Sequence, residues 1–278
     1  MRMPKAKGFK RADKWIDKYV VINVAALEQD TDELPRKMRL KSDAVIVNQG
    51  DSDSEEELIR NGKKIRVLNR KERGVGKSRN LALDNAWGDV VLFSDEDIVY
   101  EDDYAARIIQ AFRRRPDADL ILFNVRVNPN RRTYWTEKSK RVHWFNCGRY
   151  PTFSAAVRLD KLKDSGVRFS HLFGGGAPYS NGEDSLFFMD CIRAGLKVYA
   201  VSSVIGTERS RRSTWFKGYD EKFFFDRGVL YHFLYGKMAV ILGFRYLFKN
   251  RSKMCSEKGL LKCWGLLIDG VRHGSTIS

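Results

Sequence analysis

The segment from residue 89 to residue 100 constrains the fold more than any other part of this sequence. Residues 89–94 form a mostly apolar run, which three consecutive acids, Asp95, Glu96 and Asp97, bring to an end. A strand that is apolar on both faces is typical of a parallel sheet covered by helices on each side. Ligands of such sheets bind at the carboxyl edge of the strands. The sequence therefore predicts an α/β fold with a polar site where this strand ends.

Two of these acids have the spacing of a metal site. Asp95 and Asp97 are two residues apart, so on an extended chain their side chains point the same way. Two carboxylates on one side suit a hard divalent cation, Mg²⁺ or Mn²⁺, which completes its shell with water and phosphate oxygens. The alternative is a solvated turn whose acids cap the next helix. The residues alone leave both interpretations open.

Strand-like runs and helical patterns alternate along most of the chain. This order predicts a mainly parallel central sheet flanked by helices. A strand at 153–157 is also expected, for which either direction, including antiparallel, stays open. The region between the first two strands is expected to be helical. The other expected strands span 19–24, 43–48, 65–69, 89–94, 119–125 and 197–201, and the expected helices span 78–87, 104–112 and 186–192.

A glycine-rich segment precedes the first long helix but matches neither common phosphate-binding pattern. The NTPase loop needs a glycine five residues before Gly76, where the chain has Lys71. The dinucleotide fingerprint needs a glycine where the chain has Arg79. We therefore predict a basic helix N-terminus with Arg79 in its first turn, which can bind an anion through the helix dipole and unpaired N–H groups.

A second pair of acids follows a second glycine-rich loop. Residues 174–178 read Gly-Gly-Gly-Ala-Pro, which cannot form a regular element and allows close backbone approach. Glu183 and Asp184 follow at the start of a helix. Helix capping would explain the two acids but not the glycines.

The net charge of +16 is concentrated at the two ends of the chain. Residues 1–18 carry a net +5 and residues 209–278 a net +9, which leaves +2 for the centre. This distribution favours contact with an anionic surface, although charged ends can also serve solubility alone. The basic excess is terminal and no helix-turn-helix, RNP or zinc signature is present, so we expect no nucleic-acid partner.

The C-terminal third combines basic and aromatic residues. The segment 209–217 holds four cations, Arg212 among them, around the aromatic Trp215, which suits a mobile loop that covers a phosphorylated ligand. Residues 223–248 and 259–271 are apolar but interrupted by charges. They could lie in a membrane interface or form a packed helical subdomain, and both interpretations stay open.

No secretory signal or transmembrane helix is expected, and the four cysteines indicate free thiols in a reducing compartment.

Four motifs in this order resemble those of inverting glycosyltransferases of family 2. The resemblance covers residues 19 to about 230 and implies the GT-A fold with a nucleotide-sugar donor. It is strongest to bacterial enzymes that build capsular or exopolysaccharide repeat units. The motifs are Asn-Gln-Gly-Asp at 48–51, Gly-x-x-Lys-Ser-Arg-Asn at 74–80, Ser-Asp-Glu-Asp at 94–97 and Gly-Glu-Asp at 182–184.

The resemblance implies roles for the residues of these motifs. Asp97 would hold Mn²⁺ or Mg²⁺, and Asp95 would contact the nucleotide ribose or the metal shell. Arg79 would approach the uracil or the diphosphate of the donor. Asp184 would be the general base, and Glu183 would contact the acceptor. Independently, inversion needs one carboxylate to deprotonate the acceptor hydroxyl and one cation to stabilise the departing diphosphate.

Other residues are expected to contribute to donor binding. Asn48 and Asp51 would lie near the nucleotide base, while Arg212 and Trp215 would cover the bound donor. Asn48 stands where many family members have aspartate, but an amide can both donate to and accept from a uracil edge. Glu96 also replaces the usual aspartate of its motif, which matters little if it points away from the site.

These features together predict a metal-dependent glycosyltransferase with three regions. We expect a basic segment at 1–18, a GT-A catalytic domain at 19–222 and a C-terminal helical extension at 223–278. The enzyme would move a sugar from a UDP-sugar to a saccharide acceptor, which we expect to be lipid-linked. It would act at the cytoplasmic face of the cell membrane, which it would bind peripherally. The alternatives are a catalytically silent nucleotide- or membrane-surface-binding protein of the same fold, or a nucleic-acid-binding protein.

Overall fold

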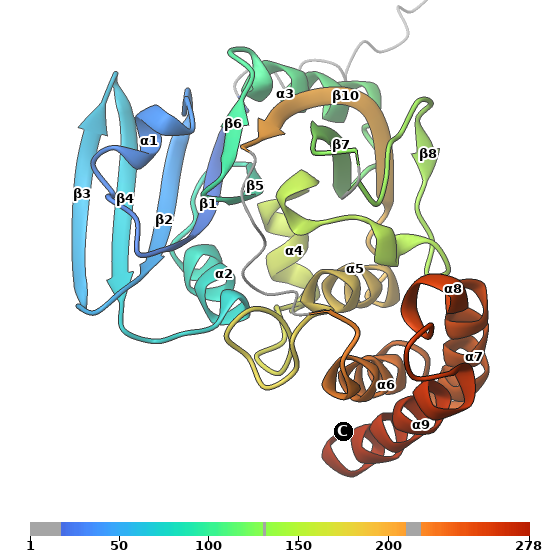
Figure 1. The fold of residues 1–278 in the computed structure, drawn as a ribbon. Coiled ribbons are helices and arrows are strands. Elements are labelled where there is room, and N and C mark those ends of the chain that lie inside the picture. The colour runs from blue at the N-terminus through green and yellow to red at the C-terminus, as the bar shows by residue number, and fades with distance from the viewer. Residues whose placement is uncertain (1–17, 130–131, 210–217) are drawn as a thin grey trace, which may run out of the picture.

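A ten-stranded mixed sheet organises the described part of the chain (Figure 1). The computed structural model describes residues 18–129, 132–209 and 218–278, so residues 1–17 of the basic N-terminal segment lie outside it. The strand order is β3-β4-β2-β1-β5-β9-β7-β10-β6, and β8 pairs with β10. The strands are β1 (Val20–Leu27), β2 (Asp43–Gln49), β3 (Ser54–Arg60), β4 (Lys63–Arg70), β5 (Val90–Asp95), β6 (Ile98–Tyr100), β7 (Leu120–Arg126), β8 (Lys140–Arg141), β9 (Ala155–Arg158) and β10 (Val198–Glu208).

The half of the sheet that leads to the acids is parallel. Strands β4, β2, β1 and β5 run in the same direction, and β7 and β10 form a second parallel pair. Strand β9 lies between β5 and β7 and is antiparallel to both. The predicted α/β fold class is confirmed, and the carboxyl ends of β1, β2, β4 and β5 meet at one edge.

Strand β3 is not predicted from the sequence, because it falls between the expected strands at 43–48 and 65–69. It pairs antiparallel with β4, and six of its seven residues are exposed. Glu55, Glu56 and Glu57 have low strand propensity, so the local pattern does not indicate a strand. Charged residues on an exposed edge strand hinder pairing with another chain.

Helices cover both faces of the sheet, because alternate strand residues point to opposite sides. Ile22 and Val24 of β1 pack with Tyr104, Ile108 and Phe112 of α3 in one core cluster. On the opposite face, α2, α4 and α5 contribute to a second large cluster. The helices flanking the sheet are α1 (Leu34–Lys37), α2 (Val75–Asp84), α3 (Tyr104–Arg114), α4 (Leu159–Ser165) and α5 (Glu183–Arg193), with the 3₁₀ turns η2 (Cys147–Arg149) and η3 (Thr152–Ser154).

The expected helix positions differ in detail from those observed. Helix α2 begins at Val75, three residues before the expected start at Ser78, and ends at Asp84. The region between β1 and β2 contains only the single turn of α1. Gly74 precedes α2 with a φ of 134°, a conformation that residues other than glycine rarely adopt, which explains why the helix starts there.

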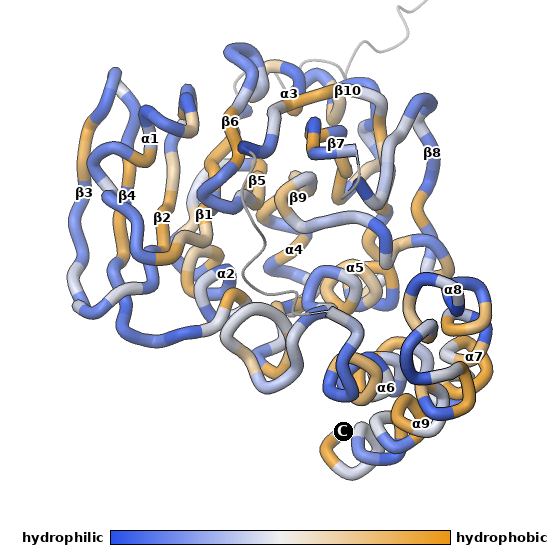
Figure 2. The backbone as a smooth tube through the Cα atoms, viewed as in Figure 1, coloured by the Kyte–Doolittle hydropathy of each residue, from blue (hydrophilic) through white to orange (hydrophobic). Residues whose placement is uncertain are grey.

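Four helices and one 3₁₀ turn form the C-terminal layer, which packs against α5. Helices α6 and α9 cross in close contact, since a Cβ atom on Gly228 would lie 2.0 Å from the carbonyl oxygen of Leu267. Hydrophobic residues concentrate along the central strands and these helices (Figure 2). None of the helices described in the structure is long and apolar enough to cross a membrane. The elements are α6 (Glu221–Tyr235), η4 (Gly236–Met238), α7 (Ala239–Lys249), α8 (Arg251–Met254) and α9 (Leu260–Ile277).

Candidate active site

The acids that end β5 lie in a turn held from two sides. Asp95 is the last residue of β5, and Glu96 and Asp97 form the turn into β6. The Tyr100 hydroxyl donates to Ser94 Oγ over 2.7 Å beneath this turn. The backbone N–H of Arg209, the residue after β10, donates to the Asp97 carbonyl over 2.8 Å. The strand end is therefore fixed by neighbouring strands, and its acids are presented at the carboxyl edge.

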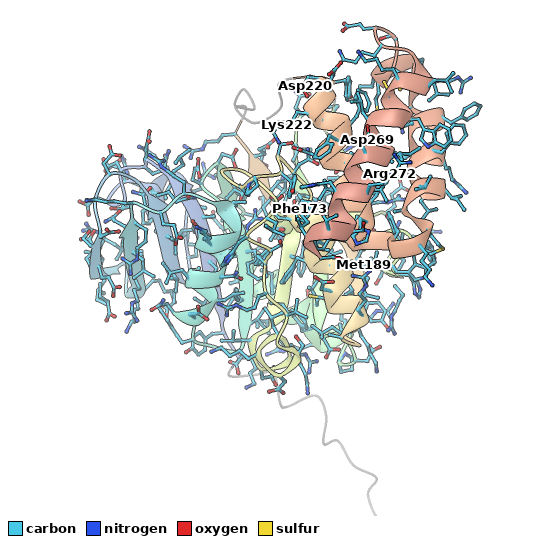
Figure 3. The ribbon with its side chains drawn as sticks, turned by 90° about the horizontal axis from the view of Figure 1, so that it is seen from below. Phe173, Met189, Asp220, Lys222, Asp269 and Arg272 are labelled. Carbon is cyan, nitrogen blue, oxygen red and sulfur yellow. The ribbon has the colours of Figure 1, made fainter. Side chains whose placement is uncertain are left out.

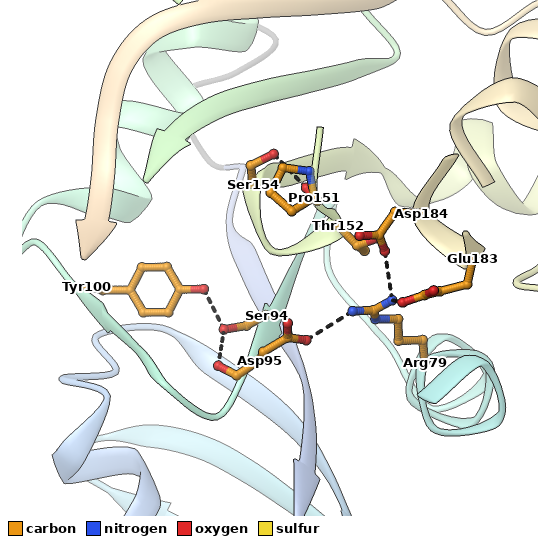
Figure 4. A network of polar contacts seen from close by, with 9 residues as sticks. All are labelled: Arg79, Ser94, Asp95, Tyr100, Pro151, Thr152, Ser154, Glu183 and Asp184. Atoms are coloured by element: carbon orange, nitrogen blue, oxygen red, sulfur yellow. Dashed lines mark hydrogen bonds and ion pairs between the residues drawn. The ribbon is translucent and has the colours of Figure 1, made fainter. Parts of the chain in front are cut away.

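Arg79 joins Asp95 to Glu183 and Asp184, which lie far from it in the sequence (Figure 4). Its side chain is only 4% exposed, and Nη2 lies 3.0 Å from Asp95 Oδ1. Its Nη1 lies 3.1 Å from Asp184 Oδ1 and 3.4 Å from Glu183 Oε1. Helix α2 thus delivers one buried cation to carboxylates from β5 and from the start of α5. This convergence places Asp95, Glu183 and Asp184 around one site.

The protonation behaviour of this cluster follows from burial and charge. Burial alone would lower the pKa of Arg79, but Asp95, Asp184 and Glu183 outweigh it and raise that pKa, so the guanidinium stays charged. Burial and the neighbouring Asp184 raise the pKa of Glu183 to about 7, although Arg79 opposes that rise. A carboxyl that titrates near neutral pH is a common property of active sites.

The loop before α5 is rich in glycine because its backbone lies close to both α2 and Glu183. Val75 N donates to Gly175 O over 2.9 Å, so the loop caps the start of α2. A Cβ atom on Gly174 would lie 2.9 Å from the Glu183 carboxyl group. The close approach of the loop backbone to the Glu183 side chain therefore requires glycine at position 174. Helix capping by the acids alone would not explain this glycine.

Asp184 is oriented from a second element that the sequence did not indicate. The Thr152 hydroxyl, in η3, donates a hydrogen bond to Asp184 Oδ1, the same oxygen that Arg79 contacts. Thr152 itself is fully buried, so this donor is fixed in place. The side chain of Asp184 is 28% exposed and can still be reached by a ligand.

A comparison with known families identifies the class of this chain. Residues 26–171, more than half of its length, match the model of glycosyl transferase family 2. The chain belongs to this family. Its GT-A fold, with a central sheet flanked by helices, agrees with that assignment. No curated protein sequence matches it.

The solved structures similar to this glycosyltransferase include several of S. aureus TarS. Its fragment 1–349 in complex with UDP-GlcNAc is 18% identical, with a TM-score of 0.59 over 84% of this chain and 73% of that one. The same fragment without a named ligand is 19% identical, with a TM-score of 0.57 over 84% and 72% of the two chains. Full-length TarS gives a TM-score of 0.54 at 19% identity, and the match covers 84% of this chain and 43% of that one. At these identities the similarity shows the fold alone.

Two other residues expected to bind the donor, Asn48 and Asp51, do not lie among the carboxylates around Arg79. Asn48 is 7% exposed, and its amide donates to Gln29 O and Asn69 Oδ1 and accepts from Gln29 N, each over 3.0 Å. Asp51 is fully exposed, 3.8 Å from Arg73. Gln49, which the sequence did not single out, accepts from Gly74 N over 2.6 Å. The structure does not bring Asn48 and Asp51 into the carboxylate cluster, and Arg212 and Trp215 lie outside the described residues.

The strand-end acids fit a divalent cation bound together with a diphosphate. Asp95 is 33% exposed and Asp97 is also partly exposed, so both carboxylates can be reached. Within the described ranges, no group of three or more His, Cys, Asp or Glu residues could hold a metal ion. Mg²⁺ nevertheless needs only one or two carboxylates from a protein when phosphate oxygens and water complete its shell.

Proposed function

We propose that this family 2 enzyme transfers a sugar from a UDP-sugar to a hydroxyl group of a saccharide acceptor, with inversion. The observation that carries the proposal is the contact of one buried Arg79 with Asp95 on one side and with Glu183 and Asp184 on the other. A donor held at the end of β5 would thereby meet a base held at the start of α5. TarS, similar in fold, was solved with UDP-GlcNAc, which supports a uridine nucleotide.

On the donor side, Asp95 and Asp97 would hold Mn²⁺ or Mg²⁺. The bound cation would neutralise charge on the departing diphosphate. Asp95 is kept in place by Arg79, and the turn that carries Asp97 is anchored by Arg209. Asn48 would contribute indirectly by holding Gln29, since its own amide is engaged within the protein.

On the acceptor side, Asp184 would take the proton of the attacking hydroxyl group. The oxygen then forms a bond to the anomeric carbon, the bond to the diphosphate oxygen breaks, and UDP leaves with that electron pair. Thr152 and Arg79 both contact Asp184 Oδ1, so they orient the carboxylate. Glu183 would contact the acceptor and, with a pKa near 7, can donate a hydrogen bond when protonated.

Donor binding and donor use test this proposal directly. Calorimetry with UDP should show binding that depends on Mn²⁺ or Mg²⁺. A screen of UDP-sugars for UDP release should then identify the donor. Failure of UDP to bind in the presence of Mn²⁺ would favour a catalytically silent protein of the same fold and would remove the proposed reaction.

The outer face of α7 supports a lipid-linked acceptor and reversible binding to an anionic membrane. Ile241, Phe244 and Phe248 recur along one side of this helix and are 73%, 37% and 50% exposed. Leu261, at the start of α9, is 76% exposed. Residues 237–262 hold seven Lys or Arg and one acid. Apolar side chains flanked by cations are typical of helices that lie in the interface of an anionic leaflet. The enzyme would then work at the cytoplasmic face of the cell membrane. Its role there would be the synthesis of a cell-surface polysaccharide.

Vesicle co-sedimentation tests the membrane contact with a matched control. A variant with Ile241→Ser and Phe248→Ser should bind anionic vesicles at least about tenfold more weakly than the wild type, because each buried side chain of this size contributes about 1.5–3 kcal/mol. Ile59→Ser, at a 67% exposed apolar position on the acidic strand β3, should change nothing. Equal, negligible binding of the wild type to anionic and neutral vesicles at low salt would rule the contact out.

A further inference from the structure

The C-terminal helices hold the loop that carries the acceptor-side acids. Residues 173–182, here called the acid-bearing loop, lead directly into α5 and its first residues Glu183 and Asp184. Helices α6 and α9 contact this loop at several points. Figure 3 shows Lys222 where α6 meets the loop and Phe173 close to the same junction. The segment that leads to the acids therefore contacts a layer that lies outside the sheet.

The strongest of these contacts is a buried carboxylate. Asp226, in α6, is 2% exposed, and its Oδ2 accepts from both Ser180 N and Ser180 Oγ over 2.9 Å. Lys222 Nζ lies 2.9 and 2.7 Å from the two oxygens of Asp226 and donates to Pro178 O over 3.0 Å. One ion pair of α6 thus engages the backbone of the loop on both sides of residue 179.

Packing contacts surround this polar contact. The Tyr179 hydroxyl lies 2.9 Å from His273 Nε2 of α9. Gly182, the residue just before Glu183, has a φ of 113°, and a Cβ atom there would lie 2.3 Å from Leu230 Cδ2 of α6. The Phe173 and Phe233 rings meet edge to face at 5.5 Å. The loop is therefore held at its start, in its middle and at its junction with α5.

A buried carboxylate is an inefficient way to gain stability alone. The Asp226 side chain is removed from water while its partner Lys222 stays 58% exposed, and an apolar residue of similar volume at a buried charged position often stabilises a fold as well or better. A carboxylate that accepts a backbone N–H, in contrast, fixes the position of one segment, because hydrogen bonds to a charged group are short and directional. The contacts of Asp226 with Ser180 have this form.

We propose that Asp226, supported by Lys222, is a positioning residue for Glu183 and Asp184. It fixes the acid-bearing loop so that both carboxylates remain in contact with Arg79 and face the donor. The proposal rests on the proposed function, because it assigns Asp184 the role of base. A displacement of about 1 Å at a reacting group can lower the rate about 10²-fold.

Hydrogen exchange of the full chain tests the positioning without any substrate. Asp226→Ala should speed amide exchange in residues 174–186 and leave β1, β2 and β5 unchanged. Asp226→Asn, which keeps an oxygen for Ser180 N–H, should restore much of the protection. Ser180→Ala should have a smaller effect of the same kind and does not disturb the buried charge. Glu221→Gln is the matched control, since it breaks only an exposed pair between Glu221 and Lys262 on the same two helices.

Kinetics then separates positioning from general stability. Asp226→Ala should keep the UDP affinity measured with Mn²⁺ within about twofold, while kcat should fall about 10²-fold. The readout is UDP release from the UDP-sugar that the wild type uses fastest, and Asp226→Asn should recover most of the rate.

Two results would overturn the inference. One is unchanged exchange in residues 174–186 of Asp226→Ala, or equally faster exchange over the whole chain. The other is unchanged kcat despite a loosened loop. If the wild type binds no UDP, the proposed function fails separately, and the exchange pattern alone decides whether Asp226 fixes the loop.

Discussion

Replacing Glu183 by glutamine should stabilise the protein, and more so as the pH rises. The pKa of Glu183 is raised from 4.5 to about 7, and its side chain is only 15% exposed. This difference corresponds to about 3 kcal/mol, at roughly 1.4 kcal/mol per pKa unit. Because the folded-state pKa is the higher one, the contribution of Glu183 to stability is fully present below pH 4.5 and is lost as the pH rises through about 7. A neutral glutamine does not undergo this loss.

Urea unfolding between about pH 5 and pH 8.5 measures this effect. Near pH 8.5, Glu183→Gln should unfold with a free energy about 3 kcal/mol above that of the wild type, and the difference should shrink toward zero as the pH falls to about 4.5. Glu221→Gln, at an exposed position, is the control and should show no such trend. A variant that is no more stable than the wild type at pH 8.5 would contradict the reasoning, as would a difference that is the same at every pH.

Three further substitutions test the charges of the site. Asp97→Asn should abolish the metal-dependent part of UDP binding in calorimetry, and an unchanged affinity would contradict the metal role. Asp184→Asn should keep UDP affinity and lower transfer about 10²–10⁴-fold, whereas wild-type turnover would mean that Asp184 only caps α5. Arg79→Met leaves three carboxylates without their buried counter-charge, so urea unfolding at neutral pH should show a loss of about 3–5 kcal/mol that becomes smaller in acid. A loss that is the same at acid pH would point to packing instead.

The elements that the sequence predicted correctly are those with a local signal. Buried strands such as β1, β2 and β5 are continuous apolar runs, and α3 shows a helical apolar period with Pro116 beyond its end. The sequence indicates strand β9 and leaves its direction open, whereas its place between β5 and β7 depends on pairing with strands far away in sequence. Local patterns carry little information about such pairing.

The convergence on Arg79 lies beyond what sequence patterns can show. Its partners are separated from it by 16, 104 and 105 residues. The motifs identified each acid as a candidate, but not that one buried guanidinium would contact all three. The sequence also cannot show that a side chain is already engaged within the protein. The Asn48 amide has the right chemistry for a uracil edge, but in the fold it holds Gln29. Asp226 carries no local signal beyond being one charge in an apolar stretch, since its partner Ser180 lies 46 residues away.

The two interpretations of the C-terminal region, a packed subdomain and a membrane-facing layer, are compatible in this fold. Helices α6 and α9 pack closely through Gly228 and Gly270, and α6 contacts the acid-bearing loop. Helix α7 packs on them through Gly243, which leaves Ile241 and Phe248 on its outer side. Helices α6 and α9 therefore carry the contacts proposed to hold the loop, whereas the outer side of α7 carries the proposed membrane contact. Substitutions at Ile241 and Phe248 should weaken vesicle binding without changing UDP affinity in solution, since neither side chain takes part in the contacts that hold the acids.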